Sequence, residues 1–145
     1  MSIQSVLTVC IGNICRSPMA HVLLAQALPD LRIASAGTAA LVGHPADSMA
    51  VELMRERGLD LGSHRATQVS QLLCQQADLI LVMDPQQRQH LENRYPQVRG
   101  KVYRIGHFIQ QDVPDPYQQP RAAFEHALAL IEQGVQDWTQ RIRAL

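Results

Sequence analysis

The chain alternates between short apolar runs and longer stretches in which apolar residues recur at helical spacing. Short apolar runs are typical of buried strands, and a spacing of three or four residues is typical of one face of a helix. This pattern predicts strands near 5–10, 31–36, 79–83 and 101–106, and helices near 17–28, 47–57, 70–76, 85–94 and 121–143. The alternation predicts an α/β fold in which helices cover both faces of a parallel sheet.

Residues at the ends of these segments support the predicted boundaries. Gly58 is expected to end the second helix, because glycine readily adopts the backbone conformation that follows a helix. Ser70 and Asp84 are expected to cap the two helices that follow them, and Pro85 suits a first helical position. With 145 residues and no repeats, the chain is expected to form a single domain over residues 1–145.

Composition and charge exclude several classes of function. The 13 Lys and Arg residues balance the 13 Asp and Glu residues, and no basic tail or patch predicts binding to nucleic acid. No apolar run approaches the roughly 18 residues of a membrane-spanning helix, and the N-terminus lacks a secretory pattern, so no membrane insertion is expected. Cys10, Cys15 and Cys74 are badly spaced for a zinc site and indicate a reducing compartment. We therefore expect a cytoplasmic protein without a metal.

The segment of residues 10–18 carries the candidate chemistry. It follows the first predicted strand and leads into the first predicted helix. At such a helix N-terminus, free backbone N–H groups and the helix dipole favour negative charge. Arg16 adds a planar guanidinium that matches two oxygens of a phosphate. A cysteine in this position loses its proton more readily than a free cysteine, which makes Cys10 a candidate nucleophile.

Small and polar residues in the same segment fit this chemistry. Gly12 and Asn13 tolerate unusual backbone angles, so the loop can turn its N–H groups inward around an anion. Ser17 could either cap the helix or donate its hydroxyl to the thiolate of Cys10. A buried packing residue is the alternative for the cysteine alone, whereas a nucleotide-binding loop is excluded because its glycine and lysine pattern is absent. The loop therefore predicts a site for a tetrahedral oxyanion.

The run VCIGNICRSP at residues 9–18 resembles the signature of the low-molecular-weight protein tyrosine phosphatases. Further matches extend along nearly the whole chain, at residues 35–37, 62–66, 81–84 and 114–117. The resemblance implies a four-stranded parallel sheet with helices on both faces, in the flavodoxin-like phosphotyrosine phosphatase I fold. It also implies an enzyme that hydrolyses phosphotyrosine without a cofactor.

The family implies a role for each residue of the site. Cys10 would attack phosphorus and form a phosphocysteine, Arg16 would stabilise the equatorial oxygens, and Asp115 would protonate the leaving phenolate. Asp115 lies between two prolines in a stiff polar loop, with an ordinary turn aspartate as the alternative. The residues expected to bind phosphate are Ile11, Gly12, Asn13, Ile14, Cys15, Arg16 and Ser17. The residues expected to support this loop are Asn13, Ser17, Ser35 and His64.

Specificity is expected to come from a rim formed by Leu41, Val42 and Tyr117. This aliphatic rim, with Gln118 after the tyrosine, resembles the bacterial members that are paired with tyrosine autokinases of capsule and exopolysaccharide export. The expected partner is therefore a tyrosine-phosphorylated protein, namely a bacterial tyrosine autokinase. Ile11 suits a phenyl ring, whereas relatives that dephosphorylate arginine tend to carry threonine after the nucleophile.

Three other functions stay open for the sequence alone. A protein arginine phosphatase would use the same mechanism. An arsenate reductase that works through thioredoxin would need two further cysteines, and only Cys74 remains. A non-catalytic phosphotyrosine-binding module would be expected to lack the nucleophile or the acid. The family also implies a redox role, in which Cys10 and Cys15 form a disulfide that protects the nucleophile; a packing thiol is the alternative for Cys15.

Overall fold

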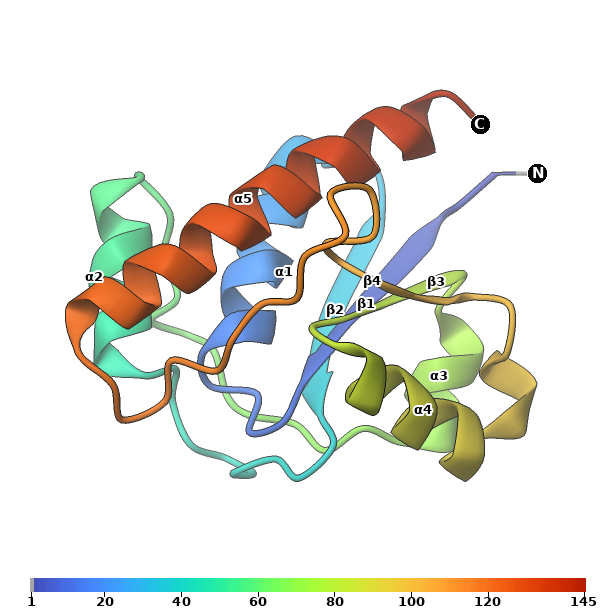
Figure 1. Cartoon of the computed structure of the whole chain (residues 1–145), viewed down its shortest axis with the longest axis horizontal. Coiled ribbons are helices and arrows are strands. Elements are labelled where there is room, and N and C mark those ends of the chain that lie inside the picture. The colour runs from blue at the N-terminus through green and yellow to red at the C-terminus, as the bar shows by residue number, and fades with distance from the viewer. Residues whose placement is uncertain (1) are drawn as a thin grey trace.

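Four parallel strands form a sheet in the order β2-β1-β3-β4 (Figure 1). The computed structural model describes residues 2–145. The strands are β1 (Ser5–Cys10), β2 (Arg32–Gly37), β3 (Leu79–Val82) and β4 (Val102–Arg104). The helices are α1 (Arg16–Ala27), α2 (Ser48–Glu56), α3 (Gln71–Gln76), α4 (Pro85–Arg94), the short 3-10 helix η1 (Pro96–Val98) and α5 (Arg121–Arg143). The predicted α/β class and parallel sheet are confirmed.

Both faces of the sheet are buried, and successive residues of a strand point to opposite faces. Along β1, Val6 and Cys10 belong to the core that α1, α2 and α5 cover. Leu7 and Val9 belong to a second core, which includes Cys74 of α3 and side chains of α4 and η1. Figure 1 shows the two groups of helices on opposite sides of the strands. The apolar runs in the sequence thus reflect strands that are buried on both sides.

The predicted helix ends are confirmed by hydrogen bonds. The hydroxyl of Ser70 accepts a bond of 3.2 Å from the N–H of Leu73 at the start of α3. The carboxylate of Asp84 accepts a bond of 2.8 Å from the N–H of Gln87 at the start of α4. After α2, Gly58 adopts a positive φ of 76°, which is the left-handed conformation that ends many helices.

The last strand is shorter than the predicted 101–106. β4 ends at Arg104 because the chain turns at Gly106, whose carbonyl accepts a hydrogen bond from the N–H of Gln111. A Cβ on Gly106 would collide with the backbone oxygen of Gln111, so this close approach needs glycine. The other predicted segments differ from the observed ones by no more than one residue at either end, and η1 was not predicted.

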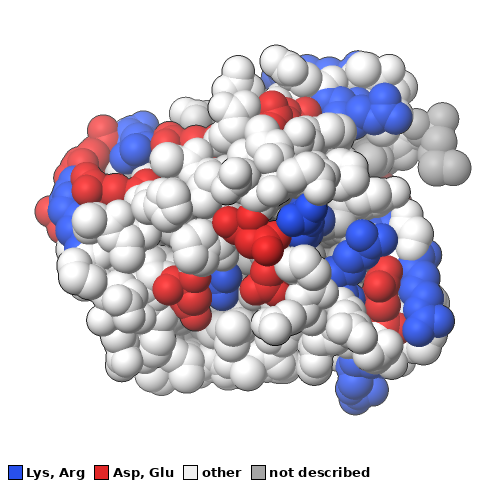
Figure 2. Space-filling model, viewed as in Figure 1, with Lys and Arg blue, Asp and Glu red and all other residues white. Residues whose placement is uncertain are grey.

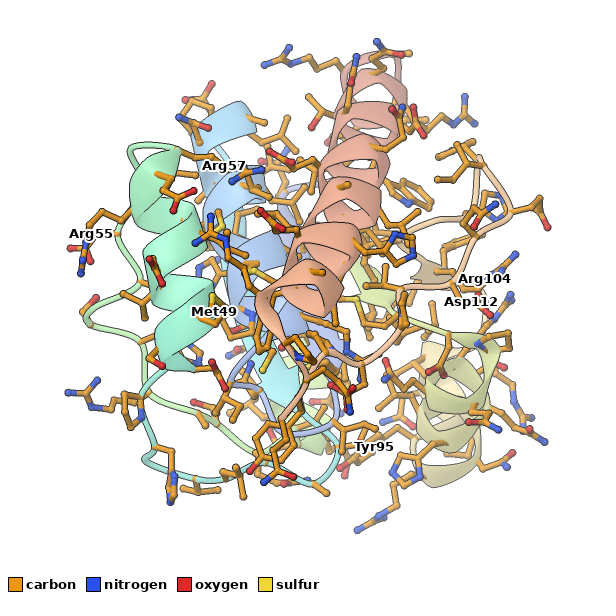
Figure 3. All side chains as sticks on the ribbon, turned by 60° about the vertical axis from the view of Figure 1, so that its left-hand side comes forward. Met49, Arg55, Arg57, Tyr95, Arg104 and Asp112 are labelled. Atoms are coloured by element: carbon orange, nitrogen blue, oxygen red, sulfur yellow. The ribbon has the colours of Figure 1, made fainter. Side chains whose placement is uncertain are left out.

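Residues other than Lys, Arg, Asp and Glu form most of the face drawn in Figure 2, and charged side chains of both signs lie on it in separate groups. Several of them join α2 to α5: Arg121 lies 2.8 Å from Glu56, and Arg57 lies 2.8 Å from Glu132. Figure 3 shows Arg57 on the side of α2 that faces α5. Within residues 2–145, no helix has the length and apolar character needed to cross a membrane.

Candidate active site

The loop of residues 10–16 connects the carboxyl end of β1 to the start of α1, at the edge of the sheet where open α/β proteins bind ligands. Every carbonyl group of residues 10–15 accepts a hydrogen bond from the surrounding chain. The donors are the backbone N–H groups of Thr38, Ala39, Leu41, Asp47 and Met19 and the ring nitrogen of His64. The carbonyl side of the loop is therefore fully bonded and turned toward the protein.

The N–H groups of the same loop are free. Within the described residues 2–145, those of Gly12, Asn13, Ile14 and Cys15 donate no hydrogen bond. The last three of these residues are buried, and buried N–H groups without a partner are rare because they are costly. A tetrahedral oxyanion is the kind of group that satisfies several converging N–H donors at once.

Asn13 fixes this arrangement of the loop. Its φ is 58°, a left-handed conformation that costs energy for a residue other than glycine. Its side-chain amide donates to Ser17 Oγ at 2.8 Å and to Ser35 Oγ at 3.1 Å, and accepts from the N–H of Thr67 at 2.8 Å. The ring of His64 binds the Asn13 carbonyl at 2.6 Å. All the residues predicted to support the loop thus lie in one hydrogen-bonded network.

Ser17 lies against the thiol of Cys10. The distance between Ser17 Oγ and Cys10 Sγ is 2.9 Å. The amide of Asn13 donates to Ser17 Oγ, whose own hydrogen has two acceptors within reach: the sulfur of Cys10 at 2.9 Å and the carbonyl of Ala36 at 3.4 Å. Of the two roles open for Ser17, capping is ruled out, since the residue at the cap position of α1 is Cys15, which makes no side-chain bond there.

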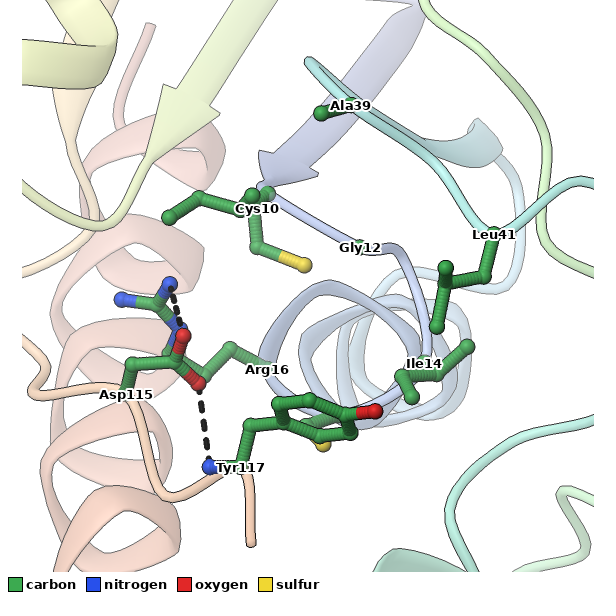
Figure 4. Close-up of a pocket in the computed structure, with 10 residues that line it drawn as sticks. Cys10, Gly12, Ile14, Arg16, Ala39, Leu41, Asp115 and Tyr117 are labelled. Carbon is green, nitrogen blue, oxygen red and sulfur yellow. Dashed lines mark hydrogen bonds and ion pairs between the residues drawn. The ribbon is translucent and has the colours of Figure 1, made fainter.

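Arg16 joins the loop of residues 10–16, the candidate phosphate loop, to the loop that carries Asp115. Its guanidinium is buried, and its Nη1 donates to the carbonyl of Val113 at 2.8 Å. Its Nη2 lies 3.6 Å from the carboxylate of Asp115, whose side chain is 45% exposed. The other carboxylate oxygen of Asp115 accepts the N–H of Tyr117 at 3.1 Å (Figure 4). An anion bound in the loop would therefore lie next to both a guanidinium and a carboxyl group.

Gln87 is a support that the sequence analysis missed. Its side-chain oxygen accepts the N–H of Met83 at 2.9 Å, and the Met83 carbonyl accepts the N–H of Val113 at 3.0 Å. A buried chain of hydrogen bonds thus runs from α4 to Arg16. The signal was present: Asp84 and Gln87 have the spacing of a capping box, in which the third helical residue turns back toward the helix start.

Gln68 was also missed, and it holds the rim. Its side-chain oxygen accepts the N–H of Ala40 at 2.9 Å, and its nitrogen donates to the carbonyl of Thr38 at 2.9 Å. One exposed amide therefore clamps the loop of residues 38–40 from both sides. No sequence pattern distinguishes this glutamine from other surface glutamines.

The loop and its rim enclose a cavity of about 160 Å³ (Figure 4). Cys10, Arg16 and Asp115 lie at its polar side, and Leu41 and Tyr117 are among its apolar walls. The complete lining is Cys10, Ile11, Gly12, Ile14, Cys15, Arg16, Ala39, Leu41, Asp115 and Tyr117. Val42, which was predicted for the rim, lies outside this lining and is 66% exposed. The N–H of Leu41 donates a hydrogen bond to the carbonyl of Gly12, which holds Leu41, and not Val42, at the cavity.

Cys15 differs from Cys10 in its surroundings, although both are free buried thiols. Burial raises the pKa of Cys15 far above its usual value, and the nearby carboxylates of Asp47 and Asp115 raise it further. Cys15 is therefore a neutral thiol at physiological pH and does not serve as the nucleophile. Across residues 2–145, no group of three His, Cys, Asp or Glu side chains is arranged to hold a metal ion.

Known proteins share the sequence and the fold of this chain. The family model described as "Low molecular weight phosphotyrosine protein phosphatase" matches residues 5–145. A Ralstonia nicotianae protein, "Probable low molecular weight protein-tyrosine-phosphatase EpsP", is 52% identical over 143 residues, which cover 99% of each chain. The Escherichia coli protein "Low molecular weight protein-tyrosine-phosphatase Wzb" is 41% identical over 142 residues, with 97% of each chain covered.

A solved structure agrees with the computed fold over almost the whole chain. Vibrio vulnificus Wzb, solved in complex with benzylphosphonate, superposes with a TM-score of 0.92 at 43% sequence identity. The superposition covers 94% of this chain and 97% of the other.

Proposed function

The chain belongs to the low molecular weight protein-tyrosine-phosphatase family, and we propose that it hydrolyses phosphotyrosine in proteins through a phosphocysteine intermediate on Cys10. One observation carries this proposal. In the loop of residues 10–16, the carbonyl groups of residues 10–15 all accept hydrogen bonds from the protein around the loop. Four N–H groups of the same loop stay free beside a thiol and a guanidinium. Such a preorganised loop stabilises a phosphoryl group most strongly when charge develops on it in the transition state.

In the first half of the reaction, the thiolate of Cys10 attacks phosphorus. The S–P bond forms as the bond between phosphorus and the tyrosine oxygen breaks. The hydroxyl of Ser17, 2.9 Å from Sγ, stabilises the thiolate by a hydrogen bond. The guanidinium of Arg16 and the free N–H groups bind the equatorial oxygens, over which the charge of the transferring group is spread.

Asp115 acts as the proton carrier of both halves. Its carboxyl lies in the lining of the cavity, and Pro114 and Pro116 stiffen the loop around it. It donates a proton to the leaving phenolate oxygen, and the resulting carboxylate then takes a proton from the water that attacks the phosphocysteine. This second attack releases phosphate and returns Cys10 as a thiolate, so the reaction needs no cofactor and no metal.

The substrate we infer is a tyrosine-phosphorylated bacterial autokinase that controls exopolysaccharide production. Ile11, Leu41 and Tyr117 line the cavity and suit the phenyl ring of phosphotyrosine, whereas a shorter phosphoserine would not reach the loop past them. The relatives EpsP and Wzb are named as protein-tyrosine-phosphatases, which supports phosphotyrosine as the substrate. The aliphatic rim, which resembles that of bacterial members paired with tyrosine autokinases, supports the choice of partner. We assign the reaction to the cytoplasm, because a reducing compartment keeps the nucleophile as a thiol.

The first test compares initial rates on two peptides of the same sequence, one with phosphotyrosine and one with phosphoarginine. Cys10→Ser is the blank, and Cys74→Ser is the control for loss of a cysteine outside the site. We expect a strong preference for phosphotyrosine that disappears in Cys10→Ser and persists in Cys74→Ser. A preference for phosphoarginine would keep the mechanism and reject the substrate, while turnover by Cys10→Ser would reject the nucleophile.

The role of Asp115 has its own test. Asp115→Asn should slow the hydrolysis of phenyl phosphate by about 10²–10⁴-fold, the usual contribution of a general acid. Esters with a very acidic leaving group need little protonation, so their hydrolysis should be slowed much less. Asp30→Asn, an exposed aspartate outside the cavity lining, is the matched control. Equal losses on both substrates would mean that Asp115 only positions the loop.

A further inference from the structure

A second and larger groove, of about 620 Å³, lies away from the phosphate loop. It is formed where β3 and β4 begin, against the C-terminal part of α5 and the loop that follows β4. Its lining is Ser2, Ile3, Asp78, Leu79, Gly100, Lys101, Tyr103, His107, Phe108, Trp138, Arg141 and Leu145. None of these residues lines the active-site cavity.

Aromatic rings form one wall of this groove. Trp138 lies with its ring centroid 5.4 Å from that of Tyr103 and 4.8 Å from that of Phe108, and His107 lies 5.0 Å from Phe108. The chain has six Phe, Tyr and Trp residues, and three of them meet here. The side chain of Phe108 is nevertheless 46% exposed, so the wall offers apolar area that the fold itself leaves uncovered.

The wall is held in place before any ligand arrives. The indole N–H of Trp138 donates to the carbonyl of Arg104 at 3.2 Å. The guanidinium of Arg104, at the end of β4, pairs with Asp112 of the loop that follows at 2.6 Å, and Figure 3 labels both residues. α5 approaches the same loop closely, since a Cβ on Gly134 would lie 2.6 Å from the carbonyl oxygen of Ile105. A preformed wall lowers the cost of binding.

The charges that face the groove favour an anion. Arg141 makes no ion pair and no side-chain hydrogen bond with any other residue in 2–145. Lys101 adds a positive charge, although its Nζ already donates to the carbonyls of Cys74 and Ala77. Asp78 is the opposing carboxylate, and it accepts the N–H of Gln4 at 2.8 Å. Two cationic side chains, Lys101 and Arg141, thus face one carboxylate, Asp78, and Arg141 is the one of the three without a hydrogen-bond partner for its side chain in the described residues.

The neighbouring surface has the same sign. Residues 85–104, which form α4, η1 and β4, contain five Lys and Arg residues and a single acidic residue, Glu92. In Figure 2 many of the blue side chains lie on the right-hand side of the molecule, where these elements are drawn in Figure 1. Arg88 pairs with Glu92 and Arg104 pairs with Asp112, so the excess positive charge is that of Arg94, Arg99 and Lys101, which attracts acidic segments of a partner.

We propose that this groove docks an acidic segment with an aromatic side chain, carried by the phosphoprotein that the enzyme dephosphorylates. The aromatic side chain packs against Phe108, which lies against the buried Trp138, and an adjacent carboxylate binds Arg141. Only the identity of the partner rests on the proposed function; the binding itself does not. β1 has six residues and spans about 20 Å, so an extended linker of at least about six residues would separate the docked segment from the phosphotyrosine.

The only tryptophan of the chain, Trp138, lies in this groove and reports its occupation. We would titrate the protein with an unphosphorylated peptide of alternating glutamate and tyrosine, under selective tryptophan excitation and with inorganic phosphate saturating the active site. Arg141→Gln should weaken binding by about tenfold, the usual loss for a charge-assisted hydrogen bond. Arg99 is an exposed arginine at the C-terminal end of η1 and lies outside the lining, so Arg99→Gln should change the affinity for the peptide by less than about twofold.

A peptide in which alanine replaces every tyrosine should bind the unchanged protein no better than Arg141→Gln binds the original peptide. Equal losses for Arg141→Gln and Arg99→Gln would reduce the effect to general charge attraction, and no saturable fluorescence change would reject the site. If the tryptophan fluorescence changed when the protein was diluted without peptide, the groove would be occupied by a second copy of the chain, which would also overturn the proposal. Turnover of para-nitrophenyl phosphate tests the proposed function separately, and Arg141→Gln should leave it unchanged.

Discussion

Replacement of Asn13 by alanine tests whether the phosphate loop is held by the network around this residue. The Asn13 side chain is fully buried and makes three hydrogen bonds, to the hydroxyls of Ser17 and Ser35 and from the N–H of Thr67. Asn13→Ala removes all three. It also places a residue with a Cβ and no polar side chain at a φ of 58°.

The expected loss of stability follows from these contacts. Each lost hydrogen bond in a folded protein costs about 1 kcal/mol net, so the three together cost about 3 kcal/mol. The left-handed conformation costs alanine about 1 kcal/mol more, which gives a total of about 4 kcal/mol in the free energy of unfolding. For a urea dependence of about 2 kcal/mol per molar, the midpoint of unfolding should fall by about 2 M.

Urea unfolding and steady-state kinetics measure the two consequences. The turnover number should fall by at least about tenfold, because N–H groups that are no longer fixed stabilise the transition state less well. Asn13→Gly separates the two contributions to stability: it loses the same hydrogen bonds but adopts the positive φ without strain. We therefore expect Asn13→Gly to be no less stable than Asn13→Ala, although glycine usually destabilises. Asn93→Ala, on the exposed side of α4, is the matched control.

Three results would refute this reasoning. If Asn13→Ala unfolded at the same urea concentration as the unchanged protein, the hydrogen bonds would contribute nothing to the fold. If Asn13→Ala lost stability but kept its turnover number, the network would support the fold and not the arrangement of the N–H groups. A clear stability advantage of alanine over glycine at this position would contradict the left-handed conformation.

Three further predictions concern the rim, pH and oxidation. Gln68→Ala frees the loop of residues 38–40, so KM for a phosphotyrosyl peptide should rise severalfold while turnover of para-nitrophenyl phosphate stays the same; equal effects on both substrates would contradict a role in the rim. Burial lowers the pKa of His21 below 6.5, so the unfolded chain binds the proton more readily, and stability should be complete above pH 6.5 and fall below it; urea midpoints of His21→Gln should depend less on pH over this range. If Cys15 forms a disulfide with an oxidised Cys10, peroxide treatment of Cys15→Ala should cause inactivation that dithiothreitol no longer reverses, and unchanged recovery would assign Cys15 to packing.

The parts of the fold that could be predicted depend on local patterns. β1 and β3 are buried on both faces, so their apolar runs stand out in the sequence. The caps at Ser70 and Asp84 act within a single turn of helix, and they fixed the helix starts to within one residue. The end of β4 was missed because it depends on the approach of Gln111 to Gly106, which is a contact across a turn and leaves no periodicity.

The same distinction applies to the site. Cys10, Arg16 and the loop between them are contiguous, because a single strand-to-helix connection can supply an anion-binding loop. Supports from distant segments could be named only from the family resemblance, as for Ser35 and His64, which hold that loop. Gln68, which holds the rim, could not be named at all. No sequence pattern identifies a glutamine that will hold a loop in place, because this role depends on which loop lies within hydrogen-bond distance of its amide in the folded chain.

Arg16 shows why the distant segments matter for the chemistry. A guanidinium that binds only phosphate would need no contact with the acid loop, yet Arg16 donates one hydrogen bond to Val113 and lies 3.6 Å from Asp115. Val113 is in turn held by Met83, and Met83 by Gln87, so the position of the acid depends on a residue in α4. The single buried side chain of Arg16 therefore holds the loop of residues 10–16 and Asp115, the proposed proton donor, in a fixed relative position. Changes in Gln87 should consequently affect the leaving-group dependence of the reaction before they affect the binding of phosphate.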